Sequence, residues 1–115
     1  MAFVGGGGSL EAQPGVRAVD APTFPEHYKP EALAQAEALD ILRSYTGDIA
    51  WTYMSPPPHH LLPGPKTSHY IVQAGDAPVV NADGDSCITS GDFAAAFVDE
   101  LEQNRFPGQR FTAGS

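Results

Sequence analysis

The chain has 115 residues, enough for one domain with a buried core. Its net charge of −8, from 14 acidic and 6 basic side chains, argues against nucleic acid and anionic membranes as partners, because both bind through lysine and arginine. No apolar stretch approaches membrane length, and no signal peptide is evident. A lone cysteine, Cys87, excludes an internal disulfide, so we expect a cytoplasmic protein in which Cys87 is a buried structural residue.

The first predicted element is the end of a buried strand at residues 2–4, whose beginning we expect to be missing. Glycines 5–8 and Ser9 follow at once, and glycine lets the backbone approach a ligand closely. The same composition also occurs in flexible cloning linkers, so that alternative stays open. The Phe-Val before the glycines and Leu10-Glu11 after them favour a turn at the end of a strand.

Residues 11–29 hold three prolines and no periodicity, which predicts a long loop with Phe24 and Tyr28 packed on the body. A helix is predicted from Glu31 to Arg43, since Pro30 suits a first helical turn and an acidic residue complements the positive end of the helix dipole. The apolar face of this helix is predicted to comprise Leu33, Ala36, Ala38, Leu39, Ile41 and Leu42.

Residues 49–54 are rich in β-branched and aromatic side chains and predict the next strand, which Ser55 and three prolines end. A strand after a helix implies a right-handed crossover in a parallel sheet. Farther on, the pattern predicts a loop over residues 59–69 and short strands at 70–72 and 79–80.

A second helix is predicted to open near Thr89, because Thr89 and Asp92 have near capping-box spacing. Asn104 and Pro107-Gly108 are expected to end it, and residues 110–112 to form a short last strand. The predicted buried stripe of the helix is Phe93, Ala94, Phe97, Val98 and Leu101.

Several stretches, in this order, resemble the C-terminal half of the atypical short-chain dehydrogenase/reductase group, and most closely its NAD(P)H-binding, NmrA-like NADH-flavin reductase subgroup. The resemblance covers nearly the whole chain and implies an α/β fold, one domain over residues 1–115 that is half of a doubly wound, Rossmann-like parallel sheet. It also implies hydride transfer from NAD(P)H to a flavin or a small carbonyl compound. The matching segments are residues 4–10, 24–34, 51–56, 83–86, 88–92 and 109–112.

The resemblance also implies which residues approach the cofactor. Gly5, Gly6 and Ser9 would lie near the nicotinamide, and Ser55 and Pro56 would border the nicotinamide or the substrate. The alternative for the glycines is a plain turn.

Tyr28 precedes the first helix where short-chain dehydrogenases keep a catalytic tyrosine, so the resemblance makes it a candidate proton donor. The family's lysine four residues later is replaced by Ala32, while Lys29 is adjacent, so a packed, half-exposed tyrosine is the alternative.

The family's G-x-x-G-x-x-G turn, which holds the cofactor pyrophosphate at a helix N-terminus, does not occur here. We therefore expect weak or no NAD(P)H binding by this chain alone, and completion of the fold by a homodimer or by a chain that supplies the missing half. Two alternatives remain open: a non-catalytic module that dimerises through an open strand edge, and a small enzyme with a new site at a dimer interface.

Three histidines and two aspartates are candidate metal ligands by residue type alone. Adjacent His59 and His60, with His69 nearby, are expected to be solvated loop residues, because neighbouring loop histidines rarely point at one ion. Asp83 and Asp85 lack the flanking ligands of a calcium loop and are expected to form a turn. The sequence therefore predicts no metal site.

Overall fold

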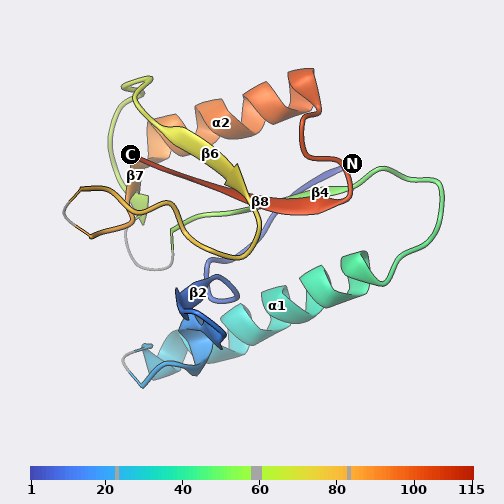
Figure 1. Cartoon of the computed structure of the whole chain (residues 1–115), viewed down its shortest axis with the longest axis horizontal. Helices are drawn as coiled ribbons and strands as arrows, with labels where there is room; N and C mark the ends of the chain where they lie inside the picture. The colour runs from blue at the N-terminus through green and yellow to red at the C-terminus, as the bar shows by residue number, and fades with distance from the viewer. Residues whose placement is uncertain (23, 58–60, 83) are drawn as a thin grey trace.

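A four-stranded sheet lies between two helices in the computed structural model, which describes residues 1–22, 24–57, 61–82 and 84–115 (Figure 1). The strand order is β1 (Ala2–Val4), β4 (Thr52–Ser55), β8 (Gln109–Gly114) and β6 (Ile71–Ala74). β1, β4 and β8 run parallel, and β6 pairs antiparallel to β8. The predicted α/β class with a parallel sheet is confirmed.

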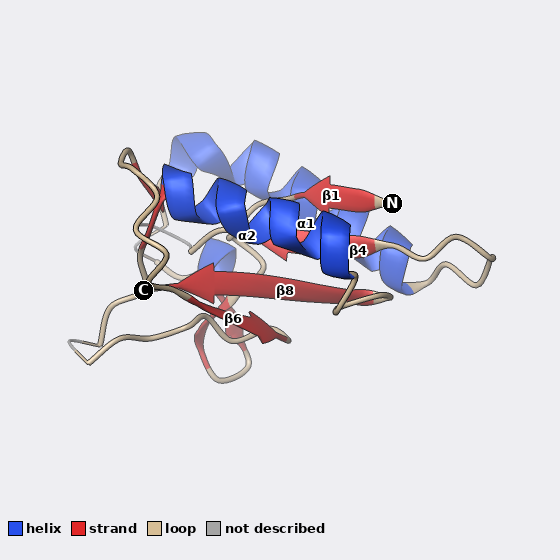
Figure 2. Ribbon diagram, turned by 90° about the horizontal axis from the view of Figure 1, so that it is seen from above, coloured by secondary structure: helices blue, strands red, loops and turns tan. Residues whose placement is uncertain are grey.

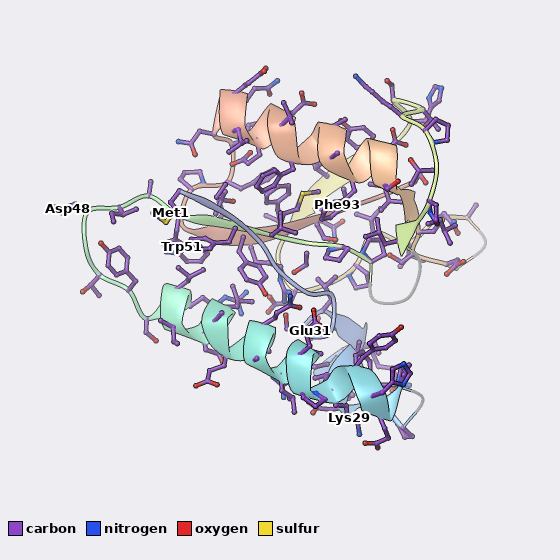
Figure 3. The ribbon with its side chains drawn as sticks, turned by 180° about the vertical axis from the view of Figure 1, so that it is seen from behind. Met1, Lys29, Glu31, Asp48, Trp51 and Phe93 are labelled. Atoms are coloured by element: carbon purple, nitrogen blue, oxygen red, sulfur yellow. The ribbon has the colours of Figure 1, made fainter. Side chains whose placement is uncertain are left out.

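The two faces of the sheet carry different cores because side chains alternate along each strand. On one face Tyr53 and Trp51 pack with Leu39 of helix α1 (Lys29–Arg43). On the other, Met54 of β4 joins a cluster with helix α2 (Ser90–Gln103). That cluster comprises Met54, Ile88, Ala96, Phe111 and Ala113, flanked by half-buried aromatics that include Phe93, which extends from α2 toward the sheet (Figure 3). The view from above shows both helices running along the strands (Figure 2).

Helix α1 confirms the predicted helix and begins two residues earlier, at Lys29. Its predicted apolar face is partly wrong, because Leu33, Ala38 and Ile41 are exposed. The buried residues are Ala32, Ala36 and Leu39, a narrow stripe that contains small side chains where the backbone approaches closely. A side-chain carbon on Gly8 would lie 2.9 Å from the Ala32 Cβ, so this contact requires glycine on one side and a small residue on the other.

Helix α2 confirms the predicted start, because the Thr89 hydroxyl accepts a hydrogen bond from the Asp92 amide at 3.1 Å. It ends at Asn104, which adopts a left-handed conformation (φ 48°). The predicted buried stripe is wrong for Ala94, Val98 and Leu101, which are exposed. The fully buried positions are instead Asp92, Ala96 and Glu100.

Two acidic side chains occupy the buried face of α2 because they accept backbone hydrogen bonds from the flanking loops. Asp92 accepts from the amides of Thr67 and Ser68 at 2.8 and 3.0 Å. Glu100 accepts from the amides of Arg105 and Phe106 at 3.0 and 2.9 Å. Hydropathy patterns assign acidic residues to the solvent-exposed face of a helix, so they do not predict buried carboxylates that accept hydrogen bonds from loop amides.

The segment predicted as a loop from 11 to 29 contains short regular elements. β2 (Glu11–Gln13) and β3 (Val16–Arg17) form an antiparallel hairpin, followed by short 3-10 helices η1 (Ala18–Asp20) and η2 (Glu26–Tyr28). Isolated pieces of two or three residues leave no periodic signal in a sequence.

The remaining strands differ from the prediction in extent. The strand predicted at 49–54 occupies 52–55 instead, since its pairing with β1 starts at Thr52. β6 covers 71–74, whereas the predicted strand at 79–80 is absent from this described segment. The predicted loop contains β5 (Leu61–Leu62), which pairs parallel with β7 (Ile88–Thr89). Among the described residues, no helix combines the length and apolar character needed to cross a lipid bilayer.

Candidate cofactor cleft

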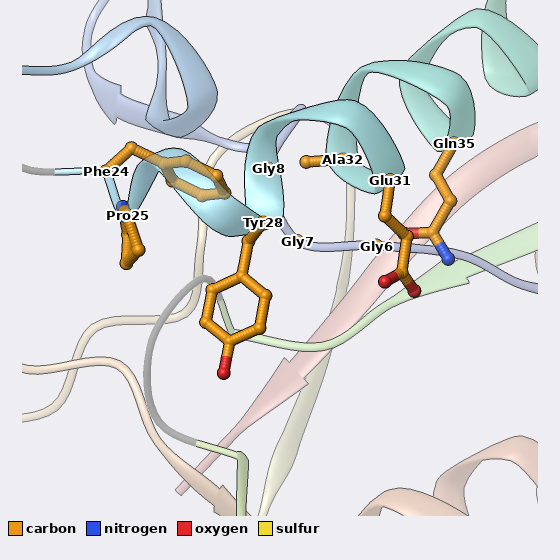
Figure 4. A pocket seen from close by; sticks show the side chains of 9 residues that line it. All are labelled: Gly6, Gly7, Gly8, Phe24, Pro25, Tyr28, Glu31, Ala32 and Gln35. Atoms are coloured by element: carbon orange, nitrogen blue, oxygen red, sulfur yellow. The ribbon is translucent and has the colours of Figure 1, made fainter.

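A cleft of about 370 Å³ separates the glycine segment, residues 5–9, from the first turns of α1 (Figure 4). It opens at the carboxyl end of the parallel strand β1, the position where open α/β sheets bind ligands. In Figure 4 the side chains of Tyr28, Glu31 and Gln35 leave the side of the helix that faces the glycines. The lining residues are Gly6, Gly7, Gly8, Phe24, Pro25, Tyr28, Glu31, Ala32 and Gln35.

The glycine segment forms one wall of the cleft. This wall is backbone without side chains, and it packs closely against its neighbours. A Cβ on Gly5 would overlap the Tyr53 ring, and one on Gly6 would overlap the Gln35 carboxamide oxygen. Close packing against the Tyr53 ring therefore requires glycine at position 5, which a flexible linker would not need, whereas a side chain at position 6 would displace only the end of Gln35. Gly7 and Gly8 are buried, and within the described part of the chain their amides donate to no other group. Two N–H donors without an acceptor among the described residues thus belong to the lining of the cleft.

Tyr53 of β4 contacts the glycine segment and helix α1 through its hydroxyl. Its hydroxyl accepts a hydrogen bond from the Gly6 amide at 3.3 Å and donates one to the Gln35 carbonyl at 3.0 Å. Burial raises the pKa of Tyr53, and the hydrogen bond from Gly6 opposes that shift. The phenol is therefore neutral and links the glycine segment to α1. The sequence predicted Tyr53 only as a strand residue.

Tyr28 lies at the mouth of the cleft, at the end of η2, with 55% of its surface exposed. Its ring packs against His27, with ring centroids 4.1 Å apart. The adjacent Lys29 ammonium binds the Glu26 carboxylate at 3.0 Å. The structure thus brings Tyr28 to the glycine segment, and its role as proton donor stays a prediction.

The five predicted cofactor-binding residues are not all brought together. Gly6 lines the cleft, and Gly5 stands just before it, with its amide donating to the Met54 carbonyl at 2.9 Å. Ser55 is fully buried, Pro56 is half-buried, and neither lines the cleft. Ser9 also turns away from the cleft, toward the arginine described next.

A buried arginine, Arg110, lies below the end of the glycine segment. Its Nη1 donates to the hydroxyls of Ser9 and Ser55 at 2.8 and 3.1 Å, and its Nη2 donates to the Ser9 carbonyl at 3.1 Å. Nη2 also binds the Asp76 carboxylate at 2.9 Å, which Arg43 of α1 contacts at 2.6 Å. Sequence reasoning missed this network, because its members are far apart in the chain.

The pKa values of Arg110 and Asp76 are both lowered, for different physical reasons. Burial lowers the pKa of the Arg110 guanidinium, and its hydrogen bond to Asp76 opposes the shift. Partial burial of Asp76 acts to raise the pKa of its carboxyl, but hydrogen bonds from Arg43 and Arg110 outweigh it and hold that pKa below its usual value. Asp76 is therefore ionised and shared by two guanidinium groups.

The residues considered as metal ligands are dispersed or lie outside the described residues. His59, His60 and Asp83 belong to the latter group, and His69 and Asp85 are exposed. Within the described ranges, no three His, Cys, Asp or Glu side chains gather as an ion would require. Cys87 is half-buried, not fully buried as predicted, and its sulfur lies 3.8 Å from the Ser115 carbonyl oxygen.

Comparison with known proteins places the fold among Rossmann-like structures. No model of a known protein family matches the chain. The uncharacterized protein YwnB of Bacillus subtilis (strain 168) is 42% identical over 119 residues, which covers 100% of this chain and 54% of YwnB. The chain thus spans about half the length of the curated relative it matches.

Three crystal structures are similar over nearly the whole chain, and each belongs to a protein about twice as long. A protein of Bacteroides thetaiotaomicron provisionally named an epimerase has a TM-score of 0.88 at 37% identity, covering 98% of this chain and 51% of that one. A protein of Streptococcus pneumoniae provisionally named an NADH-flavin reductase has a TM-score of 0.83 at 38% identity, covering 100% and 56%. One of Burkholderia pseudomallei provisionally named an exported protein has a TM-score of 0.87 at 41% identity, covering 99% and 54%.

These likenesses confirm the Rossmann-like fold predicted from the sequence. Of the three solved neighbours, one carries the provisional name of an epimerase and one that of an NADH-flavin reductase, and together they support a reductase-like, NAD(P)-binding type of fold.

Proposed function

We propose that this chain carries the nicotinamide side of an NAD(P)H-dependent reductase site, of the NmrA-like NADH-flavin reductase kind. The observation that carries the proposal is the bare glycine backbone at the carboxyl end of β1, which forms one wall of a cleft of about 370 Å³. A flat ring can approach such a backbone closely because no side chain intervenes. The name of the Streptococcus pneumoniae neighbour supports the reductase class.

The residues of the cleft fit a nicotinamide in their chemistry. The amides of Gly7 and Gly8 can donate to a carboxamide or a ribose oxygen, and Gln35 can accept as well as donate. Phe24 offers an apolar surface for a ring. When bound, NAD(P)H supplies the hydride. Reduction of a carbonyl compound also needs a proton at its oxygen, which the Tyr28 hydroxyl at the mouth of the cleft would supply; a flavin acceptor would not require it.

A second part of the proposal is that the site is completed by another polypeptide segment, from a second copy of the chain or from a chain that supplies the other half. Within the described residues, β1 pairs with β4 on one side and with no strand on the other. A groove of about 280 Å³ adjoins the cleft along this edge and shares Gln35 with it. Its lining is largely apolar and includes Val4 and Ile41, which are 55% and 65% exposed.

The exposed apolar edge also favours a second candidate, a non-catalytic module that dimerises or binds a partner through β1. An unpaired strand beside apolar side chains is a template for pairing. A small enzyme with a new site at such a dimer interface is a variant of this candidate. For all of these candidates we propose a cytoplasmic location, because the chain has a single cysteine and no disulfide within it can form. We propose neither nucleic acid nor a membrane as a partner, because of the net charge of −8.

Calorimetric titration with NADH and NADPH tests the proposed function. The chain is titrated alone and again after mixing with the half of YwnB that it does not match. We expect weak or no binding alone and micromolar binding by the mixture. Gly6→Val, whose side chain would collide with the Gln35 carboxamide in the lining of the cleft, should abolish that binding, whereas Glu37→Gln on the exposed side of α1 should not.

No binding at millimolar cofactor in either format would contradict the reductase proposal. Light scattering on the same samples measures the oligomeric state, which distinguishes the non-catalytic module from the reductase. A stable dimer of the chain that binds no dinucleotide would favour the non-catalytic module.

A further inference from the structure

Arg110 joins three parts of the fold that are distant in sequence. It lies on β8, is 2% exposed, and contacts the end of the glycine segment, the end of β4 and the turn after β6. The carbonyl of Arg110 also accepts from the Gly75 amide at 3.1 Å, so both its backbone and its side chain hold that turn. Helix α1 is connected through Asp76 and Arg43.

Two of the four hydrogen bonds from the guanidinium go to a single residue, Ser9. Ser9 directly follows Gly8, so these bonds fix the point where the glycine segment leaves the cleft. Consecutive glycines have more conformational freedom than other residues and need external contacts to hold one geometry. Tyr53 supplies such a contact at Gly6, and Arg110 supplies it at the opposite end.

The same network also reaches helix α1, whose first turns form the other wall of the cleft. Arg43 is the last residue of α1, and its bond to Asp76 at 2.6 Å ties this helix to the turn that Arg110 holds. The Asp76 carbonyl in turn accepts from the Glu11 amide at 2.8 Å, just beyond Ser9. The glycine segment and α1 are therefore both connected to one buried guanidinium, α1 through Asp76.

The hydrogen-bond geometry of the guanidinium accounts for an arginine at position 110 better than a gain in stability does. A buried charge is costly, and apolar residues often replace buried ion pairs without loss of stability. Only arginine offers five donors in a planar fork, and here four bonds are made while Nε is buried with no partner within the described part of the chain. A lysine in this place has three donors at a single atom and cannot reproduce the set.

We propose that Arg110 is a positioning residue, which sets the geometry of the glycine segment and thereby the nicotinamide affinity of the cleft. The affinity part rests on the function proposed above, whereas the geometric part can be measured without any ligand.

The test compares Arg110→Lys and Arg110→Met with Arg17→Lys, a control arginine whose partner Asp20 is on the surface. The first readout is amide hydrogen exchange followed by NMR at Gly6, Leu10 and Val19, whose amides bond to Tyr53 or within the glycine segment. We expect their exchange to rise about tenfold in Arg110→Lys, and further in Arg110→Met, because charge-assisted bonds are lost. Amides of α2 and all amides of the control should change little.

An equal rise in the glycine segment and in α2 would mean that Arg110 only stabilises the fold, and would overturn the proposal; so would unchanged exchange in the glycine segment. The second readout is dinucleotide affinity in the mixture with the unmatched half of YwnB. Arg110→Lys should weaken it about tenfold, with the control unchanged. Unchanged affinity despite raised exchange would overturn the affinity part. A wild-type chain that binds no dinucleotide contradicts the proposed function, while exchange still decides the geometric role.

Discussion

The two helices cover opposite faces of one sheet, yet their surroundings differ in how polar groups are satisfied. At α2 the first turn is capped by Thr89, and buried Asp92 and Glu100 accept hydrogen bonds from loop amides. At α1 no described side chain caps the N-terminus, and the amides of Gly7 and Gly8 donate to no described group. The acidic groups buried on the α2 face are thus paired within the protein, whereas the α1 face presents amides without a described acceptor beside a cleft.

This difference separates the part of the molecule that maintains the fold from the part available to a ligand. Unsatisfied polar groups cost stability, so proteins tend to tolerate them where a ligand completes the bonding. Changes on the α2 face should therefore act mainly on stability, and changes on the α1 face mainly on binding.

The largest effect is expected for Glu100→Ala on the α2 face. The substitution leaves the Arg105 and Phe106 amides without their acceptor in a partly buried place, which should lower the free energy of unfolding by about 3 kcal/mol. Chemical denaturation measures the loss, and Glu102→Ala, at an exposed position on the same helix, is the control. Equal losses in the two variants would contradict the role of Glu100 as a loop cap.

Acid should affect both faces through carboxyls whose pKa values are lowered. The hydroxyl of Thr67 lowers the pKa of Asp92 most, despite opposing burial, and guanidinium bonds lower that of Asp76. A lowered folded pKa gives stability that is present above the unfolded carboxyl value of about 4 and is lost as pH falls through the folded value. The denaturant concentration at the midpoint of unfolding should decrease as the pH is lowered through this range. The decrease should be shallower in Asp92→Asn. An equally steep decline in that variant would contradict the assignment.

Tyr53→Phe is expected to act on the α1 face with a smaller loss of stability. Removal of the hydroxyl deletes its bonds to the Gly6 amide and the Gln35 carbonyl and should cost about 1 kcal/mol. Exchange of the Gly6 amide should rise more than that of α2 amides. Tyr45→Phe, at an exposed tyrosine beyond the helix, is the matched control.

Tyr28→Phe should change stability least, by less than about 0.5 kcal/mol, because the side chain is 55% exposed. If Tyr28 donates the proton, reduction of a carbonyl substrate should slow, while reduction of a flavin should not. Equal turnover of the carbonyl compound by the variant and the wild type would show that Tyr28 is not the donor.

The sequence predicted the elements with strong local signals, and the structure shows why others were missed. Helix α1 carries a long apolar period and α2 a capping residue, so both helices were predicted with nearly correct bounds. Burial on α2 was misassigned because Asp92 and Glu100 are buried by loop amides that no local pattern announces. The strand predicted at residues 79–80 failed since two β-branched residues alone do not specify pairing.

The sequence drew attention to residues that the structure places at the cleft, and it missed the contacts between segments that are distant in the chain. The glycine run and Tyr28 both belong to segments that carried the family resemblance, and both line the cleft. Arg110 contacts Ser9 across 101 positions of sequence, and such a contact has no signature in a single sequence. Ser55 was expected to face a cofactor, but its hydroxyl faces Arg110 in the interior.

The most direct test of the account is NMR mapping of NADPH and NADH binding on labelled chain mixed with the unmatched half of YwnB. The account predicts saturable shifts of the amides of Gly6, Gly7 and Gly8, together with the side-chain amide of Gln35, and none along α2. Shifts confined to the α2 face, or none at millimolar dinucleotide in a sample where the two halves associate, would contradict it.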